Sequence, residues 1–139
     1  MKEERSAGFI LFRIENNKPK FLILQYENYF DFPRGNIEKG ETELLAAKRE
    51  LAEETGIEKI KVYPFFKETI TWFYRKNKET IKKTVSYFLA ESEEKDVKIS
   101  FEHKGYAWVT YEEAMNLLKF ENSRKILEKA IKFIESTNF

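Results

Sequence analysis

The hydrophobic and polar positions of this chain alternate between short apolar runs and turn-forming segments. The apolar runs Phe9–Phe12 and Phe21–Tyr26 flank the segment Glu15–Pro19, which contains two asparagines and a proline. Apolar runs of this length bounded by turn residues are typical of buried strands, so the pattern predicts a β-hairpin. Two apolar segments follow at residues 61–66 and 69–74, and then a basic turn at 75–79. Further strands are predicted at residues 84–90 and 105–109, with a polar loop at 91–96 between them.

Three segments have the composition and spacing of helices. Residues 42–55 contain mostly good helix formers and no Gly or Pro, and Gly56 follows at the position of a left-handed helix stop. Two further helices are predicted at residues 111–118 and 123–136. The apolar stripe of the last helix consists of Ile126, Ala130, Phe133 and Ile134. Strands interspersed with one-faced helices favour an α/β fold, in which helices cover both faces of a mixed sheet.

The helix predicted at residues 42–55 carries three closely spaced glutamates. Glu50, Glu53 and Glu54 fall within an arc of roughly 100° of the helix surface. Like charges at these spacings repel each other and destabilise an isolated helix. Taken alone, such a cluster is typical of a solvated helix face. A divalent cation would convert the repulsion into binding, and Mg²⁺ takes oxygen ligands while leaving room for substrate phosphates.

The glutamate cluster is part of a longer arrangement, Gly35–Ile57. Its fixed positions are Gly35, Glu41, Arg49–Glu50, Leu51, Glu53–Glu54, Gly56 and Ile57. This arrangement resembles the signature of the Nudix hydrolases, G-x5-E-x7-R-E-U-x-E-E-x-G-U with U aliphatic, and every position is filled. The resemblance implies a Nudix-type α/β/α sandwich with a mixed central sheet. It also makes a merely solvated helix face a poor explanation of the cluster.

The Nudix resemblance also implies a reaction. Members of this family hydrolyse a nucleoside diphosphate linked to another group, and a divalent metal ion assists the attack of water on phosphorus. Mapped residue by residue, the signature makes Glu50, Glu53 and Glu54 the candidate metal ligands. Glu54 is the first choice as a ligand, whereas Glu50 is either a ligand or the base that orients water. Mg²⁺ is the expected ion, with Mn²⁺ as the alternative.

The remaining signature residues have candidate structural roles. Arg49 can pair with Glu53 one turn later or reach back to Glu41, so we expect it to hold the carboxylates in position. Gly35 is predicted where the backbone turns tightly or approaches phosphate, although an ordinary turn glycine fits equally well. Gly56 is expected to end the helix.

Beyond the signature, most of the chain resembles the asymmetrical diadenosine tetraphosphate hydrolases. The similarity is carried by residues 5–12, 31–41, 82–90 and 101–108. Two departures are Arg34, where that group usually has lysine, and Asn36, where histidine is common. Arg34 retains a cation for phosphate and can bind it through two hydrogen bonds.

Four further residues acquire candidate roles from the same resemblance. Glu102 matches an acidic position that supplies another metal ligand or the base, and His103 is a candidate for substrate binding. A surface pair is the alternative for both residues. Tyr87 matches a tyrosine that stacks on adenine, with a sheet-face aromatic as its alternative. Lys83 is a candidate for gripping phosphate, although charged turns are usually just solvated.

Length and composition bound these interpretations. The 139 residues fit a single domain, residues 1–139, that can bury a proper core. A net charge of +1 argues against bulk nucleic-acid attraction, and the absence of cysteine excludes thiolate ligands, thiolate nucleophiles and disulfides. There is no apolar leader and no run of membrane-spanning length, so we expect a cytoplasmic protein without a membrane partner. A monomer is expected, with a dimer left open.

Together these observations predict a Mg²⁺-dependent enzyme that hydrolyses diadenosine tetraphosphate to ATP and AMP. Within the enzyme class, one alternative is removal of pyrophosphate from RNA 5′ ends, against which the near-zero net charge argues mildly. Others are cleavage of ADP-ribose or of a nucleoside triphosphate. A nucleotide sensor without turnover is the alternative from a different class, but a pure binder has no need of every catalytic carboxylate. The expected partner is a small dinucleoside polyphosphate or nucleotide.

Overall fold

The computed structural model describes residues 1–100 and 102–137. Phe101, which belongs to one of the stretches compared above, and residues 138–139 therefore lie outside the described residues. The elements follow in the order β1 (Lys2–Glu15), β2 (Lys18–Gln25), β3 (Phe30–Asp31), β4 (Arg34–Asn36), α1 (Glu43–Thr55), β5 (Ile60–Lys76), β6 (Glu79–Ser92), β7 (Gly105–Val109), α2 (Tyr111–Leu117) and α3 (Glu121–Ser136).

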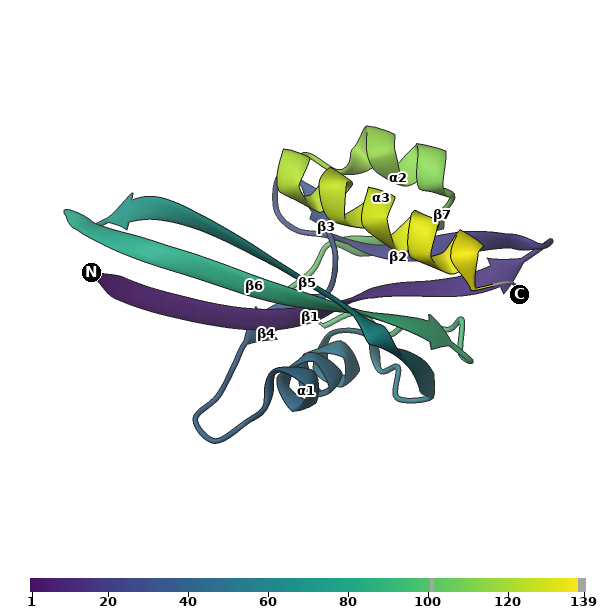
Figure 1. Ribbon diagram of the computed structural model, residues 1–139, viewed down its shortest axis with the longest axis horizontal. Helices are drawn as coiled ribbons and strands as arrows, with labels where there is room; N and C mark the ends of the chain where they lie inside the picture. Colours follow the sequence, from purple (N-terminus) through teal and green to yellow (C-terminus); the bar gives the residue numbers. More distant parts are fainter. Residues whose placement is uncertain (101, 138–139) are drawn as a thin grey trace.

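A mixed sheet forms the middle layer of the molecule. Its main strand order is β3-β2-β1-β6-β5, and β4 pairs with β1 while β7 pairs with β2. β1 and β6 run parallel, whereas the other pairs are antiparallel. Helix α1 lies against one face of the sheet, and α2 and α3 lie against the other (Figure 1). The predicted α/β/α arrangement with a mixed sheet is therefore confirmed.

Two hairpins join the long strands. The predicted hairpin between β1 and β2 turns at Asn16 and Asn17, whose φ values are 52° and 63°. Asparagine tolerates this left-handed region well, which explains its use in a two-residue turn. The two apolar segments at residues 61–66 and 69–74 belong to a single strand, β5. Its pairing with β6 is irregular between Val62 and Lys67, around Pro64, which cannot donate a backbone hydrogen bond.

The helices agree closely with their predicted bounds. Thr42 caps α1 by accepting a hydrogen bond from the backbone N–H of Leu45 at 3.1 Å, and Gly56 ends the helix with a φ of 76°. The last helix begins two residues before the predicted Ser123, at Glu121. In the part of the chain that the structure describes, no helix is long and apolar enough to cross a membrane.

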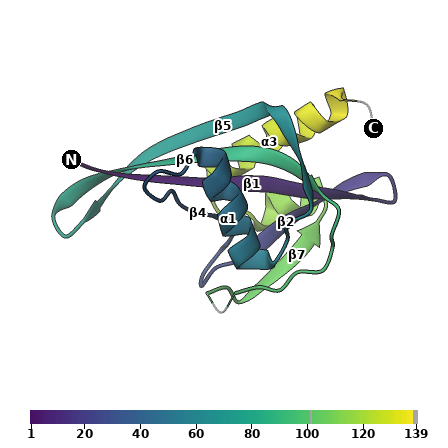
Figure 2. The same ribbon diagram turned by 90° about the horizontal axis from the view of Figure 1, so that it is seen from below.

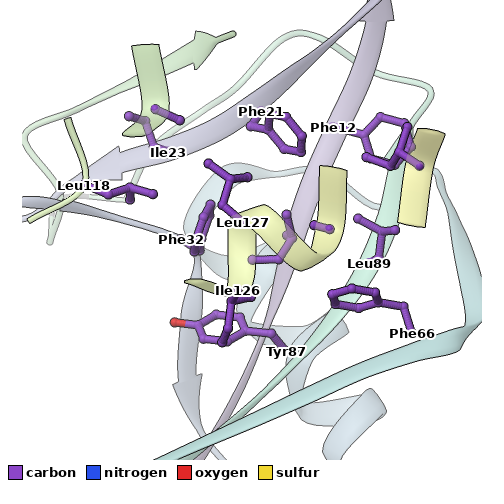
Figure 3. Close-up of a cluster of buried hydrophobic side chains, with 14 of the residues drawn as sticks. Phe12, Phe21, Ile23, Phe32, Phe66, Tyr87, Leu89, Leu118, Ile126 and Leu127 are labelled. Carbon is purple, nitrogen blue, oxygen red and sulfur yellow. The ribbon is translucent and has the colours of Figure 1, made fainter. Parts of the chain in front are cut away.

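Separate apolar clusters fill the two sides of the sheet. In β1, Ile10 and Phe12 point towards α3, whereas Phe9 and Leu11 point towards α1. Figure 3 shows the larger cluster, in which Ile126 and Leu127 of α3 pack among Phe21, Phe32, Tyr87 and Leu89. On the other side, the buried residues of α1 include Ala46, Ala47 and Leu51. These contacts hold α1 across β1 and β6 (Figure 2), so its glutamates project from a fixed support.

Candidate active site

Two glutamates of α1, Glu50 and Glu54, face an open cleft beside β4. Its volume is about 540 Å³. It is lined by Tyr26, Arg34, Gly35, Asn36, Glu38, Glu50, Glu54, Glu102 and His103. The structure therefore brings together Arg34, Gly35, Glu50, Glu54, Glu102 and His103, all of which were candidates from the sequence. Glu53 is exposed and does not line this cleft.

The loop before β7 reaches the cleft because it is tied to the end of α1. The backbone N–H of Lys98 donates to the carbonyl of Thr55 at 2.9 Å, and the N–H of Ser100 donates to the carbonyl of Glu54 at 3.2 Å. The ring of His103 also packs edge-on against Tyr26, with 4.7 Å between the ring centroids. These contacts explain how residues far apart in the sequence share one cleft.

Gly35 makes room for the carboxyl group of Glu50. A Cβ at position 35 would lie 1.9 Å from the carboxyl carbon of Glu50, far inside any permitted contact. The residue lies in the short strand β4 and not in a tight turn. The close approach for which this glycine is needed therefore involves a glutamate of the signature itself.

Arg49 is the centre of an ion-pair network that orients the acidic residues. Its Nε donates to Glu41 at 2.7 Å, and its Nη1 donates to Glu50 at 2.9 Å and to Glu53 at 3.2 Å. Its Nη2 donates to the backbone carbonyl of Asn36 at 2.9 Å. Both predicted pairings, with Glu53 and with Glu41, are present. The hydrogen bond from Arg49 also lowers the pKa of Glu41.

Glu54 is the most deeply buried acid of the cleft. Its exposed fraction is 5%, and burial together with the nearby charge of Glu50 raises its pKa to about 8. Nε2 of His103 lies 3.4 Å from Oε2 of Glu54, while burial lowers the pKa of His103. Among the described residues, Oε1 of Glu54 has no hydrogen-bond partner. Burial thus favours the uncharged form of both side chains.

The cleft has the donor chemistry of a magnesium site, although the carboxylates are not gathered around one point. Mg²⁺ prefers carboxylate oxygens, and the buried Oε1 of Glu54 is an acceptor that lacks a donor. Within residues 1–100 and 102–137, no three acidic, histidine or cysteine side chains are close enough to enclose an ion. Arg49 holds Glu50 and His103 lies beside Glu54. The carboxylates must therefore turn towards one another to share a cation.

A second cavity, of about 330 Å³, lies on the α3 side of the sheet. It is lined by Tyr29, Asp31, Arg34, Ile70, Trp72, Tyr87, Phe120, Asn122 and Ser123. Four of these side chains are aromatic, which suits a flat, apolar group such as a nucleobase. No sequence pattern predicted a functional role for Tyr29, Trp72 or Phe120. With 13 Phe, 7 Tyr and 2 Trp in the chain, no local signal distinguishes them.

Tyr87 belongs to this cavity but is only 1% exposed. Its ring packs edge-on against Phe32, with 5.8 Å between the ring centroids. Figure 3 shows the two rings side by side in the larger apolar cluster. The hydroxyl of Tyr87 lies 3.4 Å from Nη1 of Arg34. The ring contributes to the floor of the cavity and offers little free face, so stacking on adenine stays a prediction.

Lys83 is not among the described residues that line either cavity. Its Nζ donates to the hydroxyl of Ser6 at 2.7 Å and lies 3.4 Å from Oδ1 of Asn36, which lines the acidic cleft. Burial lowers the pKa of Lys83. Its predicted contact with phosphate is untested by this arrangement.

Arg34 is the residue that connects the two cavities. Among the described lining residues, it alone belongs to both the acidic cleft and the aromatic cavity. Its Nη1 donates to Oδ2 of Asp31 at 2.7 Å, and its guanidinium carbon lies 5.6 Å from the ring centroid of Tyr26. An anion bound by Arg34 would therefore lie between a flat apolar site and a set of carboxylates.

Comparisons with known proteins find relatives along nearly the whole chain. The model of the NUDIX domain matches residues 4–130. The bis(5′-nucleosyl)-tetraphosphatase (asymmetrical) of Rattus norvegicus is 36% identical over 146 residues, which cover 96% of this chain and 97% of the rat protein. The protein of the same name from Caenorhabditis elegans is 30% identical over 136 residues, which cover 94% of this chain and 96% of that protein.

Solved structures share the fold. A binary complex of a C. elegans Ap4A hydrolase superposes with a TM-score of 0.85 at 29% identity, covering 96% of this chain and 98% of that one. The E. coli dihydroneopterin triphosphate pyrophosphohydrolase has a TM-score of 0.73 at 22% identity and covers 93% of this chain and 97% of its own. The latter likeness concerns the fold alone.

Proposed function

We propose that this chain, which belongs to the NUDIX domain family, hydrolyses diadenosine tetraphosphate to ATP and AMP. The relatives that support the substrate carry the name bis(5′-nucleosyl)-tetraphosphatase (asymmetrical), and they match nearly their whole length. The single observation that carries the proposal is the position of Arg34. It lines both the aromatic cavity and the acidic cleft, as a substrate with a base next to a phosphate chain requires.

The base and the phosphates have separate complementary surfaces in this proposal. One adenine enters the cavity lined by Tyr29, Trp72 and Phe120, where aromatic stacking favours it. Arg34 binds the phosphate next to that nucleoside through charge-assisted hydrogen bonds. The rest of the phosphate chain extends into the cleft that contains Glu50 and Glu54. We also propose that Lys83 and His103 contact the substrate, and that Tyr87 supports the adenine.

Glu50, Glu53, Glu54 and Glu102 are the proposed ligands of a divalent cation, Mg²⁺ or alternatively Mn²⁺. When bound, the ion neutralises charge on the phosphate oxygens and lowers the pKa of the attacking water. The orphan Oε1 of Glu54 supports this assignment. Glu54 acts as a ligand, and Glu50 and Glu102 act as ligands or as the base.

The other signature residues keep this acidic set in place. Arg49 fixes the rotamer of Glu50 through a hydrogen bond of 2.9 Å and holds Glu41 at 2.7 Å. Gly35 leaves the space that the Glu50 carboxyl group occupies. Glu102 lies exposed at the rim of the cleft, where water can reach it. Arg49 and Gly35 thus keep the carboxyl group of Glu50 beside the cleft in which a cation and phosphate would bind.

Product analysis in ¹⁸O-labelled water tests the proposal. The purified chain is incubated with diadenosine tetraphosphate and Mg²⁺. The products are separated, and mass spectrometry determines their masses and ¹⁸O content. We expect ATP and AMP, with the label in AMP, if water attacks the phosphorus nearest one adenosine. Two molecules of ADP would contradict the asymmetrical cleavage. A parallel panel contains triphosphorylated RNA, ADP-ribose and nucleoside triphosphates, and a clear preference for one of these would replace the proposed substrate.

Three wider properties remain proposals. Residues 1–139 form a single domain, the protein is cytoplasmic, and it acts as a monomer on a small nucleotide without binding a membrane. Sedimentation of the purified chain at several concentrations tests the monomer. Association that increases with concentration would contradict it.

A further inference from the structure

A buried carboxylate beneath the aromatic cavity is not explained by the proposed reaction. Asp31, in β3, is 2% exposed and sits between the cavity and the first turn of α3. It is not part of the glutamate set of α1, and it does not line the acidic cleft. A charged side chain at this depth is costly unless it is paired and hydrogen-bonded, so its partners should reveal what it does.

Three donors satisfy Asp31, and they divide between its two oxygens. Oδ1 accepts from the backbone N–H of Phe32 at 2.9 Å and from the hydroxyl of Ser123 at 2.9 Å. Oδ2 accepts from Nη1 of Arg34 at 2.7 Å. The two donors at Oδ1 come from different elements: Phe32 directly follows β3, and Ser123 lies in α3. Together they restrict the orientation of the carboxylate. Oδ2 is thereby aimed at the guanidinium group.

The contact leaves part of the Arg34 fork for a ligand. Both hydrogen bonds that the guanidinium group makes with described residues, to Asp31 and to Tyr87, use Nη1. A guanidinium group has further donors at Nε and Nη2, arranged in a rigid plane. A lysine could not bind a carboxylate and a phosphate in the same fixed geometry, because its ammonium group lacks a rigid planar set of donors.

Without its bond to Asp31, the guanidinium group of Arg34 would be drawn towards the carboxylates of the acidic cleft. Arg34 lines that cleft together with Glu50 and Glu54, which would attract its positive charge. The bond to Asp31 therefore keeps the guanidinium group at the junction of the two cavities.

We infer that Asp31, locked by Ser123, is a positioning residue that holds Arg34 for the phosphate attached to a nucleoside in the aromatic cavity. This inference rests on the proposed function, since it takes the occupant to be a nucleotide. The same buried carboxylate then fixes both the wall of the base site and the guanidinium group that binds the phosphate. Recognition of the base and recognition of its first phosphate are thereby linked.

Binding of AMP and of adenosine to the intact chain separates the two contributions. Titration calorimetry or NMR titration in the presence of EDTA measures both affinities without turnover. Asp31→Asn keeps the size of the side chain but removes its charge. We expect Asp31→Asn to weaken the affinity for AMP about tenfold, as the loss of a charge-assisted contact implies. The affinity for adenosine should stay within about twofold of the parent value. In an Arg34→Met background, Asp31→Asn should cause no further loss.

The control is Glu68→Gln. It removes the charge of another carboxylate that contacts α3, where Nζ of Lys129 donates to Oε1 of Glu68 at 2.9 Å. It should change neither affinity. Equal weakening of AMP and adenosine by Asp31→Asn would overturn the inference, since it would indicate a general structural role. So would unchanged AMP affinity, or the same loss in the Arg34→Met background.

A second variant and a spectroscopic measurement cover a failure of Asp31→Asn to fold. Ser123→Ala keeps the charge but releases one lock, so we expect a two- to threefold loss for AMP and none for adenosine. In ¹⁵N-labelled protein, the Arg34 guanidinium signals should report slow rotation in the parent and faster rotation in Ser123→Ala. Unchanged AMP affinity and unchanged guanidinium signals would refute the inference. Hydrolysis of diadenosine tetraphosphate is measured separately. A lack of hydrolysis alone would reject the proposed function but would leave the positioning role of Asp31 standing.

Discussion

The carboxyl group of Glu50 lies directly against the backbone of Gly35, where a Cβ would come within 1.9 Å of the carboxyl carbon. The two residues are 15 positions apart in the signature, in β4 and in α1. Their contact explains why the loop and the helix of the signature act as one unit. An acid that must be aimed into a cleft is packed against the one residue type that leaves it space.

Gly35→Ala should reduce activity strongly while leaving the fold intact. The new methyl group must displace either Glu50 or β4, and a displacement of about 1 Å can cost on the order of 10²-fold in rate. We expect a loss of stability of about 1–3 kcal/mol from the crowding. Steady-state hydrolysis and thermal unfolding measure the two effects. Gly105→Ala is the control, because its nearest neighbour is the flexible end of Gln25, at 3.2 Å. Equal activity of both variants would refute the role of this contact.

Glu54→Gln should abolish most of the Mg²⁺-dependent rate. The amide keeps the shape of the side chain but is a poor ligand for a cation, so we expect a decrease on the order of 10²-fold or more. Binding of Mn²⁺, followed by electron paramagnetic resonance, should weaken in parallel. Glu58→Gln, on the exposed segment after α1, should leave both measurements unchanged. A Glu54→Gln rate within threefold of the parent would remove Glu54 from the metal site.

The stability of the metal-free protein should depend on the protonation of Glu54. Its pKa is raised from 4.5 to about 8, chiefly by burial, so the folded state holds this proton more tightly than the unfolded state. The resulting stabilisation is complete below pH 4.5 and is lost as the pH rises through about 8. Each pKa unit of difference corresponds to about 1.4 kcal/mol. Urea unfolding in EDTA measures the trend.

The Glu54 contribution is isolated by comparing the parent with Glu54→Gln. The lowered pKa of His103 acts in the opposite sense, because protonation at low pH places a charge on a buried imidazole. Since His103 contacts Glu54, the comparison is made in a His103→Gln background, which removes this contribution from both proteins. The difference in unfolding free energy between them should therefore change between pH 4.5 and 8. A difference that is constant across this range would contradict the raised pKa.

Phe120→Ala should weaken nucleotide binding without destabilising the protein. Phe120 lines the aromatic cavity and is 41% exposed, so its truncation removes a stacking surface but little core. We expect a loss of about 1–3 kcal/mol in the affinity for AMP. Phe73→Ala is the control: it truncates another exposed phenylalanine, which is 59% exposed and lies outside the cavity, and it should bind AMP normally. Equal affinities for the two variants would place the base elsewhere.

Tyr87 requires a different design, because it is 1% exposed. Tyr87→Ala would leave a hole in the core and cost about 3–5 kcal/mol of stability, which would obscure any effect on binding. Tyr87→Phe removes only the hydroxyl near Arg34, so it distinguishes contact with Arg34 from stacking of the ring.

Local features of the sequence determined much of this protein. The cap at Thr42, the stop at Gly56 and the spacing of the glutamates fix α1 and its acidic face within a few turns of helix. The β1–β2 hairpin likewise follows from its asparagine turn. The signature spacing was sufficient to predict the Nudix family and its α/β/α fold. These features are readable because each depends on residues that are close together in the chain.

The tertiary structure alone decided which distant residues meet. Glu102 joins Glu50 and Glu54 only because a loop is bonded to the end of α1, and Tyr29, Trp72 and Phe120 share a cavity only through the order of the strands. The parallel pairing of β1 with β6, and hence the place of Tyr87 in the core, has no local signature. Asp31 belongs to the matching stretch 31–41, but nothing in the sequence marked it as a buried carboxylate. Its role depends on contacts from β4 and α3, which form when the whole sheet and its covering helices pack together.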